Sequence, residues 1–210
     1  MAKIDVVGIG PGGKDYLTPA ALKAVKEAGV LAGGERNLAL FEGHQGERFV
    51  IKNNLSELVN YINTKKNDSK VAVLASGDPG MYGILSYLRK HFKPEELNVI
   101  PGISAVQYAC ARLAMPWQDA AVVSTHGRDR GNFIEMVRRK SKVVALAGPG
   151  EAPPELARAL INAGVGDKKV YICSDLSYPA EEIKACTLDG LAGQKESWNK
   201  KNYVMVIVDE

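Results

Sequence analysis

The sequence predicts an α/β protein of two α/β domains, built around mostly parallel sheet, with a ligand cleft between the domains. Short β-branched runs alternate with helical patterns along most of the 210 residues, the order of elements found in βαβ units. Glycine-rich loops follow several of the strands, at the edge where open α/β sheets bind ligands. Hydrophobic residues make up 46% of the chain, enough for one large core or two smaller ones.

The first half of the chain alternates regularly between strand and helix patterns. Thr18 can cap free helical amides and Pro19 suits the first helical position, so the first helix is expected to begin there. The expected strands are 4–9, 30–32, 48–51, 70–75 and 97–100, and the expected helices are 19–28, 55–64, 83–91 and 104–114.

A proline and polar residues at 115–119 interrupt this alternation, which predicts a domain boundary there, with domains at 1–115 and 119–210. The second series is expected to comprise strands 120–124, 142–146 and 169–173 and helices 132–139 and 153–163. The strand patterns at 181–187 and 203–208 are separated by only a short helical piece, which indicates an antiparallel element.

Composition excludes several classes of protein. The net charge is only +3, and the sequence lacks the clustered basic patch of a nucleic-acid binder. This mild positive charge is compatible with a polyanionic small substrate. The N-terminus runs directly into a strand, and no apolar run approaches a membrane span. Cys110, Cys173 and Cys186 fit neither a disulfide framework nor a zinc site, so we expect no metal and a cytoplasmic location.

The segment 74–83 follows a β-branched run and precedes a helical pattern, which makes it a loop at the carboxyl end of a strand. Its three glycines allow close backbone approach to a ligand, while Asp78 and Tyr82 supply polar chemistry. We interpret it as a binding loop; the alternative is a plain turn, which uses the same residue types.

The segment Gly8-Ile-Gly-Pro-Gly-Gly13 formally matches the dinucleotide-binding fingerprint. That motif needs a tight turn directly into a helix, whereas Pro11 interrupts this one and the helix is expected only at Thr18. We expect an extended loop at 12–17 that lines a ligand cleft; the alternative is a turn that ends the strand.

Residues 101–104, Pro-Gly-Ile-Ser, follow a strand and open an apolar helix. Amide groups at a helix N-terminus bind anions, but Ser104 could equally serve only as the helix cap, and both interpretations stay open.

The segment Ser124-Thr-His-Gly-Arg128 also ends a strand. His126 can titrate near neutral pH and Arg128 suits a carboxylate, which predicts a substrate contact. The alternatives are a loop histidine satisfied within the protein and a surface ion pair.

Taken in order, these motifs resemble the tetrapyrrole methylase superfamily, and the resemblance covers nearly the whole chain. The superfamily marks are residues 7–12, 17–19, 77–79 and 101–104. Finer features at 33–38, 75–79, 116–120, 124–128 and 175–179 look like the cobalt-precorrin-7 C5-methyltransferase branch. The chain departs from that branch at Ser174-Asp175, where Glu-Asn is more usual.

The resemblance implies the class III methyltransferase fold, a homodimer and S-adenosylmethionine held between the domains. Carried over by position, the donor-binding residues are Pro11, Gly77, Asp78, Met81, Ser104, Ala105, Ala147 and Gly148. The expected catalytic candidates are Asp78, Tyr82 and His126, and the expected substrate contacts are Gly10, Arg36 and Arg128. The two arginines are assigned from charge, because the tetrapyrrole carries carboxylates.

The resemblance also implies a cobalt-containing tetrapyrrole as substrate. The C15 methylation and decarboxylation of fused relatives are expected on a separate polypeptide. Three alternatives are a nicotinamide oxidoreductase, a sister methylase acting on another ring position or on RNA, and a donor-binding subunit without activity of its own. The long loop before Thr18 argues against the first. The absence of a basic, aromatic-rich face argues against RNA.

Overall fold

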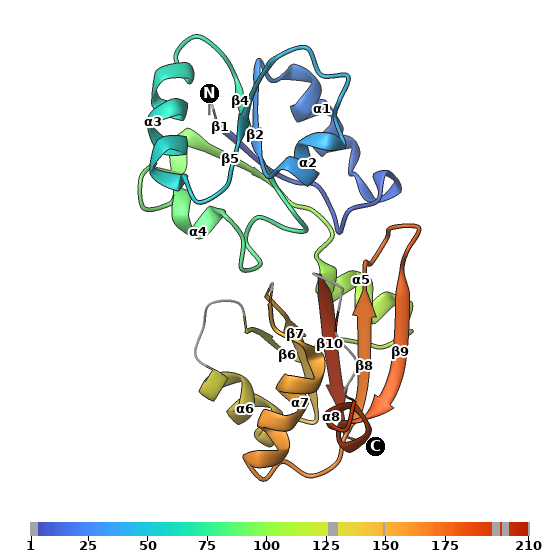
Figure 1. Ribbon diagram of the computed structural model, residues 1–210. Helices are drawn as coiled ribbons and strands as arrows, with labels where there is room; N and C mark the ends of the chain where they lie inside the picture. The colour runs from blue at the N-terminus through green and yellow to red at the C-terminus, as the bar shows by residue number, and fades with distance from the viewer. Residues whose placement is uncertain (1–3, 126–129, 149, 195–197, 199–201, 210) are drawn as a thin grey trace. The chain divides into compact units, whose positions relative to one another are not determined.

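The computed structural model describes residues 4–125, 130–148, 150–194, 198 and 202–209. It divides into two compact units, Met1–Ser104 and Ala105–Glu210 (Figure 1). Among the described residues, no helix is long and apolar enough to cross a membrane.

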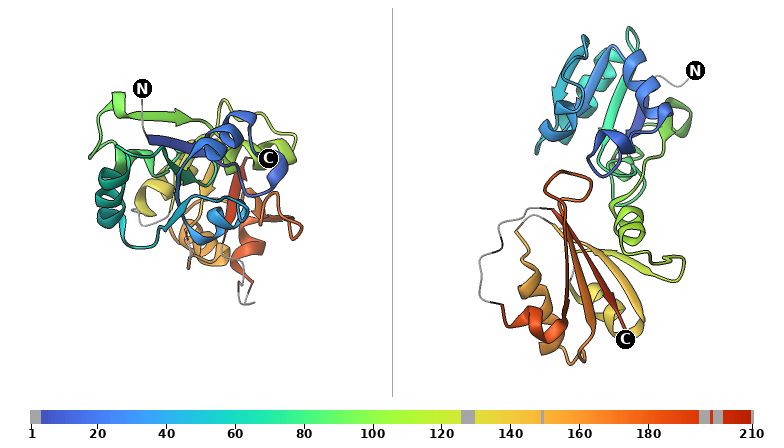
Figure 2. Two further views of the ribbon diagram at one scale, coloured as in Figure 1. Left: turned by 90° about the horizontal axis from the view of Figure 1, so that it is seen from above. Right: turned by 90° about the vertical axis from the view of Figure 1, so that its right-hand side faces the viewer.

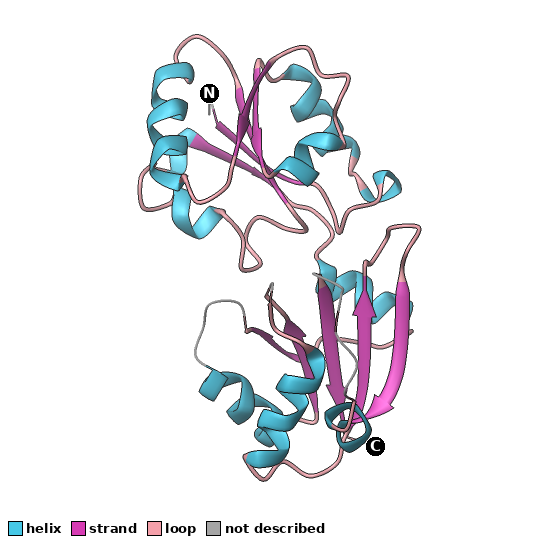
Figure 3. Ribbon diagram, in the orientation of Figure 1, coloured by secondary structure: helices cyan, strands magenta, loops and turns pink. Residues whose placement is uncertain are grey.

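The first unit is built on a five-stranded sheet in which every pairing is parallel (Figure 3). The strand order is β3-β2-β4-β1-β5. Because the strands are parallel, the loops that follow their carboxyl ends gather at one edge. The strands are β1 (Ile4–Gly8), β2 (Val30–Gly33), β3 (Glu47–Val50), β4 (Val71–Ala75) and β5 (Leu97–Ile100).

Helices cover both faces of this sheet (Figure 1). Ile4 and Val6 of β1 belong to the core formed with α3 (Leu55–Lys65) and α4 (Leu85–Leu88). Val7 and the neighbouring Leu74 belong to the opposite core, with α1 (Pro19–Glu27) and α2 (Glu35–Ala39). This alternation along buried strands confirms the prediction of βαβ units around parallel sheet.

The start of α1 is as predicted, since the Thr18 hydroxyl accepts a hydrogen bond from the Ala21 amide at 3.1 Å. Several details differ from the sequence prediction, among them the short helix α2, which was not predicted. The expected extended loop at 12–17 contains a short 3-10 helix, η1 (Lys14–Tyr16), and a second, η2 (Pro94–Glu96), precedes β5. Helix α4 is shorter than the expected 83–91: it starts at Leu85, and after Leu88 the amides of Lys90 and His91 bond to carbonyls three residues back.

The second unit has a mixed five-stranded sheet of order β6-β7-β10-β8-β9. Strands β6 and β7 pair in parallel, and the other pairings are antiparallel. The predicted antiparallel element is therefore confirmed, and the last strand lies between β7 and β8 (Figure 1). The strands are β6 (Ala121–Ser124), β7 (Lys142–Leu146), β8 (Lys169–Ser174), β9 (Glu182–Thr187) and β10 (Tyr203–Val208).

One face of the second sheet carries α6 (Arg130–Arg139), α7 (Pro153–Asn162) and α8 (Leu188–Ala192), which share a single core with it. Helix α5 (Ala105–Arg112) packs on β7 and β10 from the other side (Figures 1 and 2). The units therefore divide after Ser104 rather than at residues 115–119. The apolar residues of α5 that suggested a continuation of the first domain are buried against the second sheet.

Candidate functional site

Three loops at the carboxyl edge of the first sheet pack backbone against backbone. Gly10 and Gly77 form an antiparallel bridge, in which the Gly77 amide donates to the Gly10 carbonyl at 2.7 Å. A Cβ on Gly8 would lie 2.4 Å from the Gly102 nitrogen, and a Cβ on Gly102 would lie 2.3 Å from the Gly77 oxygen. Only glycine fits at these contacts, so the glycines first serve to bring the loops together.

Asp78 fastens two of these loops. Its Oδ1 accepts a hydrogen bond from the Gly80 amide at 2.8 Å, and its Oδ2 accepts one from the Gly102 amide at 3.2 Å. The carboxylate is half-buried, and both of its oxygens are engaged with backbone N–H groups. The structure thus gives Asp78 a structural function beside the catalytic one predicted for it.

The rest of this loop exposes an aromatic side chain. Tyr82 has a φ of 51° and is 44% exposed. Left-handed backbone at a residue other than glycine costs roughly 1–3 kcal/mol and persists only where its surroundings fix it. Here the amide of Met81 donates to the Asp78 carbonyl at 3.2 Å, and a Cβ on Gly83 would lie 2.5 Å from the Pro79 oxygen.

Arg36 stands on α2, a helix that is tied to the same loop through its neighbour Asn37. The Ser76 hydroxyl donates to the Asn37 Oδ1 at 2.9 Å, and the Asn37 amide group donates to the Leu74 carbonyl at 3.5 Å. Asn37 lies within the 33–38 motif, but its contacts with this loop were not predicted from the sequence. Its position in that motif is the one sequence feature that could have indicated a function.

The first unit therefore brings its predicted site residues to one edge of one sheet. Pro11 is buried beside the Gly10–Gly77 bridge, and Ser104 is buried directly before α5. The predicted residues gathered at this edge are Gly10, Pro11, Arg36, Gly77, Asp78, Met81, Tyr82 and Ser104.

In the second unit, Ala147 and Gly148 follow β7. The Gly148 amide donates to the Glu151 carboxylate at 3.4 Å, and the Thr125 hydroxyl after β6 donates to the same carboxylate. The loops at the carboxyl ends of these two strands are thereby joined. No sequence motif marked Glu151, whose only signal was a carboxylate shortly after a strand.

The remaining predicted residues fall in two groups. Ala105 opens α5 in the second unit. His126 and Arg128 lie outside the residues that the structure describes.

The turn after β8 lies at the same sheet edge, since Tyr203 of β10 pairs with Ser174. Glu181 holds this turn by accepting hydrogen bonds from the Ser177 amide at 2.7 Å and the Arg112 Nε at 2.6 Å. Burial raises the pKa of Glu181, but the hydrogen bonds from Ser177, Arg112 and Tyr108 outweigh it, so the pKa lies below its usual value.

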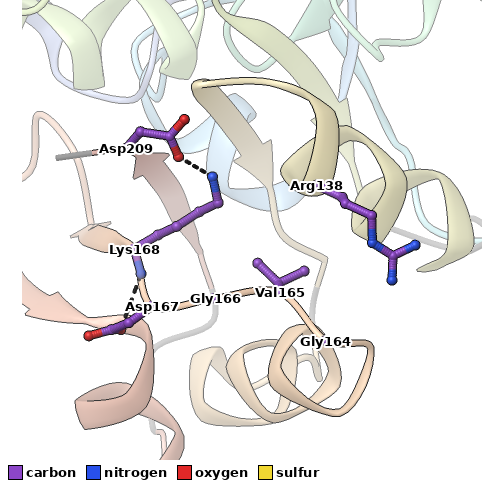
Figure 4. Close-up of a pocket in the computed structure, with 7 residues that line it drawn as sticks. All are labelled: Arg138, Gly164, Val165, Gly166, Asp167, Lys168 and Asp209. Atoms are coloured by element: carbon purple, nitrogen blue, oxygen red, sulfur yellow. Dashed lines mark hydrogen bonds and ion pairs between the residues drawn. The ribbon is translucent and has the colours of Figure 1, made fainter.

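A separate pocket of about 320 Å³ lies at the other edge of this sheet, beside the end of β10 (Figure 4). Its charged groups already have partners, because Lys168 pairs with Asp209 and the Asp167 carboxylate accepts the Lys168 amide at 3.1 Å. We therefore assign the candidate site to the carboxyl-edge loops. The pocket is lined by Arg138, Gly164, Val165, Gly166, Asp167, Lys168 and Asp209.

Comparison with known proteins agrees with the motifs. The sequence profile of the tetrapyrrole (corrin/porphyrin) methylases matches residues 3–192. The chain is 40% identical over 180 residues to cobalt-precorrin-7 C(5)-methyltransferase of Salmonella typhimurium, covering 86% of this chain and 88% of that protein. It is 34% identical over 197 residues to the probable cobalt-precorrin-7 C(5)-methyltransferase of Methanocaldococcus jannaschii, covering 90% and 91%.

Solved structures share the fold. Precorrin-6Y methylase from Archaeoglobus fulgidus superposes with a TM-score of 0.75 at 23% identity, over 99% of this chain and 98% of that one. Uroporphyrin-III C-methyl transferase from Thermus thermophilus, solved with S-adenosylhomocysteine, superposes with a TM-score of 0.80 at 21% identity, over 99% and 97%. The predicted fold class is thus confirmed.

Proposed function

The chain belongs to the tetrapyrrole methylases, and on that premise we propose that it methylates C5 of cobalt-precorrin-7 with S-adenosylmethionine, a step of cobalamin biosynthesis. The observation that carries the proposal is the 40% identity to the Salmonella enzyme of that name over 86% of the chain. The 34% identity to the Methanocaldococcus jannaschii protein, over 90% of the chain, supports the same substrate.

We propose that the donor contacts glycine-rich loops of the first unit and the loop after β7 of the second. The chemical types of these residues suit S-adenosylmethionine, because the first-unit loops present backbone polar groups around the half-buried Asp78 carboxylate. The proposed contacts are Pro11, Gly77, Asp78, Met81 and Ser104 of the first unit and Ala105, Ala147 and Gly148 of the second.

A sulfonium methyl group is already activated, so the protein needs no nucleophilic side chain. Its task is to align the methyl carbon with C5, and such positioning can lower a barrier by roughly 7–11 kcal/mol. Asp78, Tyr82 and His126 are proposed to orient the macrocycle or to stabilise changing charge on it. The Gly10–Gly77 bridge supports this function, since it ties two of the loops together and positioning requires loops that do not shift.

The tetrapyrrole is proposed to lie over the first-unit loops, against the backbone at Gly10. Its carboxylates would meet Arg36 and Arg128, whose planar guanidinium groups suit that geometry. Arg36 is exposed on a helix fixed to the Asp78 loop, which supports its part in the proposal.

Three further features are proposed from the resemblance. The enzyme acts as a homodimer. A separate C15-methylating protein is proposed as its partner; the chain is 31% identical to a precorrin-6Y C(5,15)-methyltransferase of Sinorhizobium over 86% of its own length. The enzyme works in the cytoplasm, in keeping with three free cysteine thiols.

Mass spectrometry of protein incubated with S-adenosylmethionine and cobalt-precorrin-7 tests the function, with the metal-free tetrapyrrole and a donor-free incubation alongside. We expect the cobalt form to gain one methyl group. No gain on either substrate, with S-adenosylhomocysteine still bound in a parallel titration, would move the substrate assignment to another ring position or another tetrapyrrole.

A further inference from the structure

Glu151 joins two loops of the second unit through one carboxylate. Oε2 accepts the Thr125 hydroxyl and the Gly148 amide, the latter at 3.4 Å. Oε1 lies 3.4 Å from Nε of Arg130, the first residue of α6. The Glu151 side chain is only 15% exposed, so these partners replace most of the water that an ionised carboxylate would otherwise keep.

The backbone around Glu151 is fixed as well. Its carbonyl accepts the Tyr203 hydroxyl at 2.8 Å, and its amide donates to the Gly148 carbonyl at 3.3 Å. Tyr203 is buried on β10, and its own carbonyl accepts the Ala147 amide at 3.4 Å. The backbone that carries the carboxylate is therefore tied both to the central strand of the sheet and to the loop after β7.

The Glu151 carboxylate does not cap the N-terminus of the neighbouring helix α7. Helix α7 starts at Pro153 with Ala152 as its N-cap and has no side-chain capping bond. Pro153 and Pro154 lack backbone N–H groups, so they have nothing to donate to Glu151. Burying the Glu151 charge costs free energy that an apolar residue of the same size would not cost. We therefore interpret the carboxylate as serving to fix the positions of the groups that bind it.

We infer that Glu151 is a positioning residue for methyl transfer, which sets the loop after β7 relative to the loop after β6. The inference rests on the proposed function, in which Ala147 and Gly148 contact the donor. Thr125 and Arg130, the two side chains that Glu151 holds, flank in sequence the segment expected to contact the substrate. One carboxylate thus fixes both the donor loop and the residues on each side of that segment.

The test measures the Kd for S-adenosylhomocysteine by calorimetry in Glu151→Ala, Glu151→Gln, Thr125→Val and the Glu151→Ala/Thr125→Val double variant. We expect Glu151→Ala to raise the Kd about tenfold, the loss of roughly one charged hydrogen bond. Glu151→Gln keeps acceptors for Thr125 and should raise it about threefold. The double variant should bind no worse than Glu151→Ala, because both changes break the same contact.

Glu155→Gln, an exposed glutamate four residues further on, is the matched control and should bind as the wild type does. A purely structural carboxylate would lower the melting temperature of Glu151→Ala but leave the Kd of the folded protein within about twofold of wild type. That result would overturn the inference. If Glu151→Ala does not fold, Glu151→Gln and Thr125→Val decide by the same criterion. Failure of the wild type itself to bind S-adenosylhomocysteine would instead contradict the proposed function.

Discussion

The carboxylate of Asp78 accepts a hydrogen bond from the backbone amide of Gly102 at 3.2 Å, which links the loop after β4 to the loop after β5. The same carboxylate closes its own loop through the Gly80 amide at 2.8 Å. Two strand ends that are far apart in sequence are thus held by one side chain. Any catalytic function of Asp78 is exercised from a position that the backbone fixes.

Asp78→Asn tests this linkage, because an amide presents one donor group where the carboxylate presents two acceptors. We expect the free energy of unfolding to fall by about 1–3 kcal/mol, with kcat/KM reduced as well. Urea unfolding and steady-state kinetics measure the two effects. Asp68→Asn, at an exposed aspartate, is the control. Wild-type unfolding together with wild-type turnover and donor affinity would show that Asp78 has neither function.

Gly102→Ala tests the backbone contact of the three loops. The added Cβ would lie 2.3 Å from the Gly77 oxygen, so the loops must separate, at a cost of about 3 kcal/mol. Gly34→Ala is the matched control, since Gly34 has a φ of −61° and nothing within 4 Å of an added Cβ. It should change stability by no more than about 0.5 kcal/mol. Equal unfolding midpoints for the two variants would contradict the packing described.

Arg36→Ala tests the substrate contact assigned from charge. Loss of one exposed ion pair with a tetrapyrrole carboxylate should raise the KM for cobalt-precorrin-7 about fivefold. The Kd for S-adenosylhomocysteine should stay the same, because Arg36 has no assigned part in donor binding. Arg139→Ala, which removes an exposed arginine from the last turn of α6, should leave both constants unchanged. An unchanged KM in Arg36→Ala would remove this arginine from the substrate site.

Glu181 gives the second unit a pH-dependent contribution to stability. Its pKa is lower in the folded chain than the usual 4.5, so it stabilises the fold above that pH and loses this effect as the pH falls through the folded value. Glu181→Gln should therefore be about 1 kcal/mol less stable at pH 7, and the difference should shrink below about pH 4. Urea midpoints across pH 3–7 measure this, with the exposed Glu57→Gln as control. A gap between Glu181→Gln and wild type that is constant with pH would contradict the assignment.

Local patterns were sufficient to predict most of the fold. Buried β-branched runs such as Val71–Ala75 correctly predicted the parallel strands, and Thr18 correctly predicted the start of α1. The glycine-rich loops were expected at the carboxyl edge, where the structure has them. These features depend on residues close in sequence, which a single chain displays directly.

The features that could not be predicted depend on partners far away in sequence. The pattern of α5 shows that it is buried but not which sheet buries it. The apolar run of β10 could not reveal its place between β7 and β8. Similarly, the Asp78–Gly102 hydrogen bond spans 24 residues and the Thr125–Glu151 hydrogen bond spans 26, so neither could be predicted from a local motif.

The ring position that receives the methyl group is the most direct test of the proposed C5-methyltransferase function. Protein, cobalt-precorrin-7 and S-adenosylmethionine labelled with carbon-13 in the methyl group would be incubated together, and the tetrapyrrole product examined by NMR. We expect a single labelled methyl group bonded to C5. A label on any other ring carbon, with the donor consumed, would contradict it and assign the protein to another position within the tetrapyrrole methylases.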